Sequence, residues 1–170
     1  MKAVKIILGI IIGLSLIFLG TGLVFKQTEY TTQVEIDKPI EEVFKKFEDK
    51  DLLKQWIPEL KSIDVIEEKP GKVGSTYKMV VENNGERIAM TEKVLAYVPN
   101  EKITFYFDAE NMLKTDEYTF TANNNKTKIE KKSTCKSDSY LMSCVFPYFK
   151  GTLKELDQNY LNRFKKIAEE

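Results

Sequence analysis

Apolar and polar positions follow three different patterns along this chain, and each predicts a different kind of element. Residues 6–25 contain no charged side chain. Between residues 60 and 136, apolar positions alternate with polar ones, and turn residues recur between the short runs. From residue 142 to residue 167, apolar side chains recur every three or four positions. The patterns predict an apolar N-terminal helix, an antiparallel meander of six strands and a long amphipathic helix.

Three shorter elements are expected between the apolar helix and the meander. Residues 31–36 alternate like a strand, and Asp37-Lys38-Pro39 then opens a short helix. A second short helix, residues 51–56, ends before Pro58. The whole pattern predicts an α+β fold, in which a curved antiparallel sheet of about seven strands grips the long C-terminal helix. Two short helices follow the first strand, and one transmembrane helix lies at the N-terminus.

The turn at Asn84-Gly85 fixes which side chains of the sheet share a face. A two-residue turn at that position pairs Tyr77 with Glu92. Carrying the register across the other turns gives the predicted inner face, which consists of Tyr77, Met79, Met90, Glu92, Phe105, Phe107, Tyr118 and Phe120. The C-terminal helix is expected to cover this face with Met142, Phe146 and Phe149.

The loop at residues 123–126 sets the register of the last two strands. It would pair Tyr118 with Lys131 and would also point Asp116 and Cys135 inward. A slip of one residue in such a loop would reverse the face of every side chain in the strand.

Pro147 and Gly151 interrupt the first half of the C-terminal helix. Proline removes a backbone hydrogen bond, and glycine costs about 1 kcal/mol relative to alanine. One interpretation is that a kink at Pro147 bends this half away from the sheet and leaves a cavity beneath it. The alternative is that Pro147 starts the regular helix and that the residues before it form a loop.

Glu92 is the residue of the predicted inner face that most favours a binding site. Aromatic and methionine side chains by themselves form a filled core more often than a pocket. A buried carboxylate without a partner is unfavourable, so we expect it where it is paired, hydrated or used. The alternatives are that Tyr77 or Lys131 pairs with Glu92, or that the register is different.

The N-terminal stretch, residues 1–26, favours a retained membrane anchor over a cleavable signal peptide. Residues 6–25 would span about 30 Å as a helix, and Gly20-Thr21-Gly22 is a poor cleavage site. Lys2 and Lys5 precede the span, so the positive-inside bias places the N-terminus in the cytoplasm. The remaining domain, residues 27–170, is then expected on the extracytoplasmic side.

Composition excludes several classes of function. A chain of 170 residues that is 42% apolar is expected to form one globular domain. Three of its 26 basic side chains precede residue 27, whereas all 26 acidic ones follow it, so the domain carries a net charge of −3 and no nucleic-acid footprint. The chain has no histidine, which excludes Ser-His and Cys-His nucleophile pairs and nearly every zinc site. No catalytic residue, metal or cofactor is predicted.

Two cysteines, Cys135 and Cys144, lie in the part of the chain expected outside the cytosol. A disulfide could persist there. The spacing leaves two alternatives, a disulfide or two buried free thiols, and we favour the free thiols.

Five stretches of the sequence resemble the START and polyketide cyclase-like superfamily, often called SRPBCC, which has the helix-grip fold. They are "VEIDKPIEEVFKKF", "LLKQWIPEL", "GKVGSTYKM", "EKVLAYVPNEKITF" and "FPYFKGTLKELDQNYLNRFKKIAE". The resemblance covers residues 30–169 and implies an apolar cavity beneath the terminal helix that holds lipids or other hydrophobic molecules. The pocket positions that it implies are Trp56, Met79, Glu92, Phe107, Tyr118 and Phe146. The membrane span and the absence of histidine depart from the family.

The sequence therefore predicts a membrane-anchored protein that binds a hydrophobic small molecule or lipid between the sheet and the C-terminal helix. One alternative is a cyclase- or hydrolase-type enzyme in which Glu92 is the acid or base and Lys131 or Tyr118 orients the substrate. The other is an interaction module of the cell envelope whose pocket is filled by its own side chains.

Overall fold

The helices and strands follow one another in the order that the hydrophobic pattern predicts. The computed structural model describes residues 2–83 and 85–170. The helices of these residues are α1 (Lys2–Val24), α2 (Ile40–Phe47), α3 (Lys50–Trp56) and α4 (Tyr140–Glu169). The strands are β1 (Thr28–Ile36), β2 (Leu60–Glu67), β3 (Thr76–Asn83), β4 (Glu86–Val98), β5 (Lys102–Ala109), β6 (Met112–Asn123) and β7 (Lys126–Lys136). The expected α+β class is confirmed.

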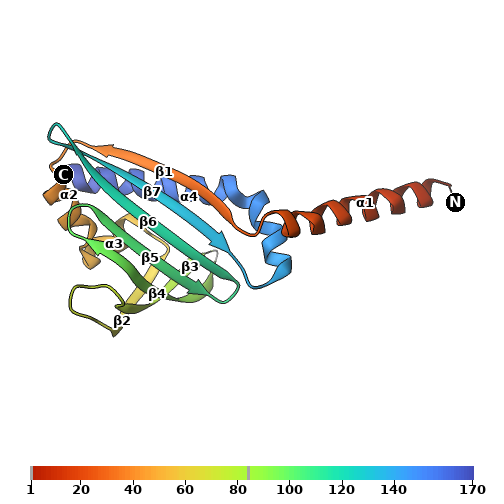
Figure 1. Cartoon of the computed structure of the whole chain (residues 1–170), viewed down its shortest axis with the longest axis horizontal. Coiled ribbons are helices and arrows are strands. Elements are labelled where there is room, and N and C mark those ends of the chain that lie inside the picture. The colour runs from red at the N-terminus through yellow and green to blue at the C-terminus, as the bar shows by residue number, and fades with distance from the viewer. Residues whose placement is uncertain (1, 84) are drawn as a thin grey trace.

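The strands form one antiparallel sheet in the order β1-β7-β6-β5-β4-β3-β2 (Figure 1). Tyr77 pairs with Glu92 across β3 and β4, and Tyr118 pairs with Lys131 across β6 and β7. Both predicted registers are therefore right. The predicted turn at Asn84-Gly85 falls partly on residue 84, which lies outside the described residues.

Strand β4 contains one irregularity that the alternating pattern does not predict. Val94 pairs with Phe105, but the next pair is Ala96 with Thr104, so Leu95 is an extra residue in β4. Such a bulge shifts the alternation of side chains by one position. It allows Tyr97 to face the same side of the sheet as Val94, which a regular strand would forbid.

The main apolar core lies where α2, α3 and the second half of α4 meet the sheet. Its buried members are Ile36, Val43, Phe44, Phe47, Trp56, Ile103, Tyr118, Phe120, Ile129, Leu161, Phe164 and Ala168. The ring of Phe47 lies at its centre, 5.5 Å from Trp56 and 5.4 Å from Phe164 between ring centroids. These aromatic contacts fix the two short helices against α4 and the sheet.

The terminal helix α4 runs for 30 residues and contains Pro147. Figure 1 shows that it changes direction in its first half, as expected where proline cannot donate a backbone bond to the preceding turn. The alternative in which the residues before Pro147 form a loop is wrong, because α4 begins at Tyr140. Phe146 packs beneath this half with Tyr30 and Cys135 in a second small core.

The last turns of α1 pack against the first half of α4, and the rest of α1 projects away from the domain (Figure 1). The Thr21 hydroxyl donates a hydrogen bond to the Cys144 carbonyl at 3.2 Å. At Gly22 an added Cβ would lie 2.5 Å from the Cys144 Sγ, so glycine permits this close approach. Cys144 and Cys135 are both buried free thiols. Residues 25–27 connect α1 to β1.

Candidate functional site

A cavity of about 90 Å³ lies between the sheet and the two short helices. The lining side chains come from α2, α3 and the loops beside them, and from β2 to β5. They are Phe47, Glu48, Lys50, Leu53, Ile63, Lys72, Tyr77, Glu92, Val94, Tyr97, Ile103 and Phe105. None of these residues belongs to α4, so the cover of this cavity differs from the predicted one. The short helices α2 and α3 form it, because the middle of α4 lies against β1 and the other end of the sheet.

Glu92 supplies a carboxyl group to this otherwise mostly apolar cavity. It lies on β4 between Tyr77 of β3 and Phe107 of β5, and it is 8% exposed. Burial raises the pKa of Glu92 to about 7, although the Lys50 ammonium opposes the change and Asp116 adds to it. No hydrogen bond from a described residue shifts the pKa of Glu92. The Lys50 ammonium forms an ion pair with Glu68 and not with Glu92. The carboxyl group is therefore available to a bound molecule.

Two lysines form the polar rim of the cavity, and each lies above a tyrosine ring. The Lys50 Nζ is 4.4 Å from the centroid of Tyr77, and the Lys72 Nζ is 4.7 Å from that of Tyr97. Lys72 also forms an ion pair with Glu48. Cation–π contacts of this kind hold a flexible ammonium group in place. The rim is therefore charged, while the rest of the lining is mostly apolar apart from Glu92.

The bulge in β4 helps to build this cavity. Without the extra residue Leu95, Tyr97 would point to the outer face while Val94 points inward. With it, both side chains line the cavity. The sequence pattern alone did not reveal this, because bulged and regular strands share the same apolar composition.

A second buried polar cluster, the Asp157 network, lies between α4 and strands β1, β6 and β7. It consists of Tyr30, Lys114, Asp116, Lys131, Ser133 and Asp157. The Asp157 carboxylate is 2.9 Å from the Nζ atoms of both Lys114 and Lys131. Asp116 also pairs with them, at 3.2 Å from Lys114 and 2.9 Å from Lys131. Two positive and two negative charges thus balance within one cluster.

Hydroxyl groups complete the Asp157 network. The Tyr30 hydroxyl donates to Asp157 at 2.8 Å, and the Ser133 hydroxyl lies 2.7 Å from an oxygen of Asp116. Burial alone would raise the pKa of Asp157, but the Lys131 and Lys114 ammonium groups outweigh it and hold that pKa well below its usual range. Lys131 is therefore committed to aspartates, and the alternative in which it pairs with Glu92 is wrong.

The structure brings three of the predicted binding residues, Tyr77, Glu92 and Phe105, into the cavity lining. The other nine lie elsewhere. Trp56, Tyr118 and Phe120 belong to the main core, and Phe146 with Met142 belongs to the second core. Met79 is buried on β3, and Met90 and Phe107 are partly exposed on β4 and β5. Phe149 is 53% exposed, so it does not cover the inner face as expected.

The role of Asp157 was not predicted from the sequence, although its position along α4 indicates that it is buried. The residues of α4 that are buried in its second half are Asp157, Leu161, Phe164 and Ala168. Their spacing of four, three and four places Asp157 on the same stripe as the apolar residues. Leu156, which the apolar stripe includes, is 42% exposed. A charged residue on the buried stripe of a helix requires a buried partner.

The described residues contain no group of three His, Cys, Asp or Glu side chains that could hold a metal ion. The cavity has a mostly apolar lining with the buried carboxyl group of Glu92 inside it and the ion pair of Glu48 with Lys72 at its rim. Such a cavity can enclose an apolar group and form a hydrogen bond to one polar atom.

Residues 27–156 match a family model described as "Polyketide cyclase / dehydrase and lipid transport". The chain belongs to this family. The match covers β1 to the middle of α4 and confirms the resemblance to the polyketide cyclase-like superfamily with its helix-grip fold. No curated protein matches the sequence.

Solved structures of this family's fold resemble most of the chain at low sequence identity. The ZhuI aromatase/cyclase of Streptomyces sp. R1128 is 14% identical, with a TM-score of 0.70 over 84% of this chain and 94% of its own. TTHA0849 of Thermus thermophilus is 14% identical, with a TM-score of 0.68 over 82% and 96%. CV1439 of Chromobacterium violaceum is 17% identical, with a TM-score of 0.67 over 84% and 98%. At these identities the likeness shows the fold.

Proposed function

We propose that this protein binds a hydrophobic small molecule or lipid in the cavity beside Glu92 and is anchored to a membrane through residues 6–25. The observation that carries the proposal is a mostly apolar cavity in which the buried Glu92 carboxyl group has no hydrogen-bond partner among the described residues. A buried carboxyl without a partner is unfavourable for folding, so its presence favours a role in binding. The family description, which names lipid transport, supports the same class of ligand.

The size of the cavity determines how a ligand would fit. Cavities that enclose a whole small molecule usually measure about 300–1,000 Å³. At about 90 Å³ this cavity accepts one ring or the end of a short chain. The remainder of the ligand would lie at the rim, between Lys50 and Lys72. A polar or anionic group at that end would replace the contacts that these lysines form with Glu68 and Glu48.

Glu92 would bind one polar atom of the enclosed part. With a pKa of about 7, the side chain is partly protonated at neutral pH. The protonated form donates a hydrogen bond to a carbonyl or ether oxygen, whereas the ionised form accepts one from a hydroxyl group. An uncharged ligand with a single oxygen near its inserted end would satisfy the carboxyl group without leaving a buried charge.

The membrane part of the proposal depends on α1. This helix is long and apolar enough to cross a membrane, and none of its residues is buried. Lys2 and Lys5 lie at its free end, so we infer a cytoplasmic N-terminus and a domain, residues 27–170, on the extracytoplasmic side. A retained signal sequence would give the same arrangement.

A cavity-filling substitution tests ligand binding. Residues 27–170 are a suitable fragment for this experiment, because solved structures of the same fold such as CV1439 consist almost entirely of the matched domain. Native mass spectrometry of this fragment after mixing with a library of fatty acids, isoprenoids and aromatic polyketides should detect a bound molecule. Val94→Phe should abolish binding, because Val94 lines the cavity.

The matched control is Val98→Phe on the same strand, where the side chain is 41% exposed. This variant should bind like the wild type. Binding that survives Val94→Phe, or that is absent from the wild type for every class of molecule, would overturn the proposal. Complete absence would instead favour the interaction module.

The pKa of Glu92 favours one second candidate, an enzyme of the cyclase or hydrolase kind. A carboxyl group with a pKa near 7 is suited to general acid–base catalysis at neutral pH. Once a ligand is known, its conversion should be measured with the wild type and with Glu92→Gln. Equal turnover by both proteins would exclude Glu92 as the acid or base.

A further inference from the structure

The first part of α4 carries an uncharged segment with exposed aromatic side chains. Residues 139–149, which we call the juxtamembrane segment, contain no Asp, Glu, Lys or Arg and are flanked by Asp138 and Lys150. Large apolar side chains of the segment face the surface. Tyr140 is 46% exposed, Leu141 58%, Tyr148 58% and Phe149 53%. Exposed apolar side chains that cluster on one helix indicate a surface that contacts a membrane or another protein.

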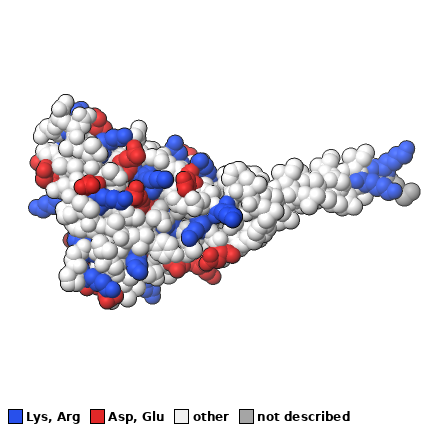
Figure 2. Space-filling model, in the orientation of Figure 1, with Lys and Arg blue, Asp and Glu red and all other residues white. Residues whose placement is uncertain are grey.

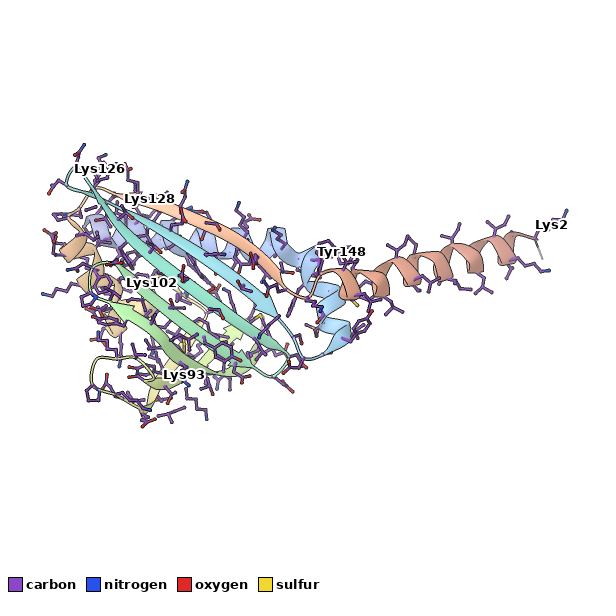
Figure 3. All side chains as sticks on the ribbon, in the orientation of Figure 1. Lys2, Lys93, Lys102, Lys126, Lys128 and Tyr148 are labelled. Carbon is purple, nitrogen blue, oxygen red and sulfur yellow. The ribbon has the colours of Figure 1, made fainter. Side chains whose placement is uncertain are left out.

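The juxtamembrane segment lies directly against α1. The Tyr140 hydroxyl donates a hydrogen bond to the Leu19 carbonyl, and the rings of Tyr148 and Phe18 stack with centroids 6.0 Å apart. Figure 3 shows Tyr148 beside the domain end of α1. The segment therefore has a fixed place relative to the apolar helix.

These contacts determine the depth of the segment. Phe18 and Leu19 lie six or seven residues inside the uncharged stretch that ends at Phe25. At 1.5 Å per residue this is about 10 Å along the helix axis. A bilayer that surrounds the uncharged length of α1 must therefore reach the level of Tyr140 and Tyr148. Figure 2 shows α1 free of charged side chains along this length, up to its first residues.

We propose that the juxtamembrane segment lies in the interfacial layer of the bilayer that α1 crosses, with Leu141, Tyr148 and Phe149 in contact with lipid. This inference rests on the proposed membrane anchor. Tyrosine side chains are typical of the boundary between lipid and water, because the ring is apolar and the hydroxyl is polar. The same exposed residues adjoin the lipid-facing surface of α1, which identifies lipid rather than a protein as their partner.

Tryptophan reporters in the full-length protein test the proposal. Phe149→Trp, Ile12→Trp on α1 and Leu95→Trp on β4 would each be placed in phosphatidylcholine nanodiscs, with and without bromine on the acyl chains. The single native tryptophan, Trp56, is 2% exposed in the main core and gives a constant background. Bromine quenches only tryptophans near the acyl chains, so Phe149→Trp and Ile12→Trp should lose fluorescence.

Leu95 is the matched control, because it is 43% exposed but lies on the sheet rather than beside α1. Its reporter should keep its fluorescence. If Ile12→Trp is quenched and Phe149→Trp is not, the anchor stands and the inference about the segment is wrong. If Ile12→Trp is not quenched, the anchor proposal itself fails, and the inference fails with it. Tyr148→Trp gives the same readout if Phe149→Trp does not fold.

Discussion

Asp157 and Glu92 are both almost completely buried carboxylates, but their surroundings are opposite. Asp157 is 2% exposed and accepts hydrogen bonds from two lysines and a tyrosine. Glu92 is 8% exposed and faces a cavity. The lysines lower the pKa of Asp157, whereas burial raises that of Glu92 to about 7. The charged groups beneath α4 are thus paired with one another, while the carboxyl group beneath α2 and α3 has no hydrogen-bond partner among the described residues.

The largest effect is expected from removing the charge of Asp157. Asp157→Asn would leave Lys114 and Lys131 with Asp116 as their single carboxylate. Breaking a buried ion-pair network in this way costs about 3–5 kcal/mol. Urea unfolding should show this loss in the free energy of unfolding. Glu155→Gln, an exposed position on the same helix, should change it by less than about 0.5 kcal/mol.

At Glu92, removing the charge should stabilise the folded protein, and the size of this effect should depend on pH. Its pKa rises from the usual 4.5 in the unfolded chain to about 7 in the folded protein, so ionisation of Glu92 opposes folding. The wild type should lose stability relative to Glu92→Gln as the pH rises from 4.5 through 7, by about 3 kcal/mol in total.

Unfolding of both proteins in urea at several pH values measures this difference. Glu86→Gln, at the exposed start of the same strand, controls for the loss of one carboxylate from β4. A constant difference between the wild type and Glu92→Gln across this pH range would contradict the proposed environment of Glu92.

A pair of aromatic substitutions compares the polar groups of the two regions. Tyr30→Phe removes a hydroxyl that donates to Asp157, and hydrogen bonds to charged groups contribute about 1.5–3 kcal/mol. Trp56→Phe removes a buried indole N–H that has no partner among the described residues. The second change also removes part of a ring that packs against Phe47 and Phe164, so its cost should come from lost packing and not from a lost hydrogen bond. Thermal unfolding followed by circular dichroism avoids using Trp56 itself as the probe.

The smallest effect is expected on the pKa of Glu92 when Lys50 at the rim of the cavity is replaced. Lys50 lowers the pKa of Glu92, so Lys50→Gln should raise that pKa slightly. A carbon-detected NMR titration of the glutamate carboxyl groups would measure the change. Lys54→Gln, an exposed position on the same helix, should leave the Glu92 titration where it is in the wild type. An unchanged or lower pKa in Lys50→Gln would contradict the attraction between Lys50 and Glu92.

Much of the fold could be predicted because local rules fix it. The two-residue turn predicted at Asn84-Gly85 implies the pairing of Tyr77 with Glu92 that the sheet has, and alternation then assigns the inner face of the neighbouring strands. The class, the order of elements and both registers followed from such rules. The extra residue in β4 was not predicted, because nothing in the local pattern marks Leu95 as unpaired.

The candidate site could be predicted only in part. Glu92, Tyr77 and Phe105 followed from register, but the cover of the cavity depends on where α4 lies across the sheet. The Asp157 network, which joins β1, β6, β7 and α4, helps to set that position. Its members are up to 127 positions apart in the sequence, and no local pattern relates them.

The short connection between α1 and β1 limits which way the protein can face. Residues 25–27 can span about 10 Å when extended, too little for the domain to turn over. Figure 1 places α2 and α3, which cover the cavity, at the opposite end of the domain from α1. If the domain binds a hydrophobic molecule and is anchored as proposed, that molecule would enter from the aqueous side, so exchange with a soluble donor or acceptor is favoured over direct extraction from the anchoring membrane.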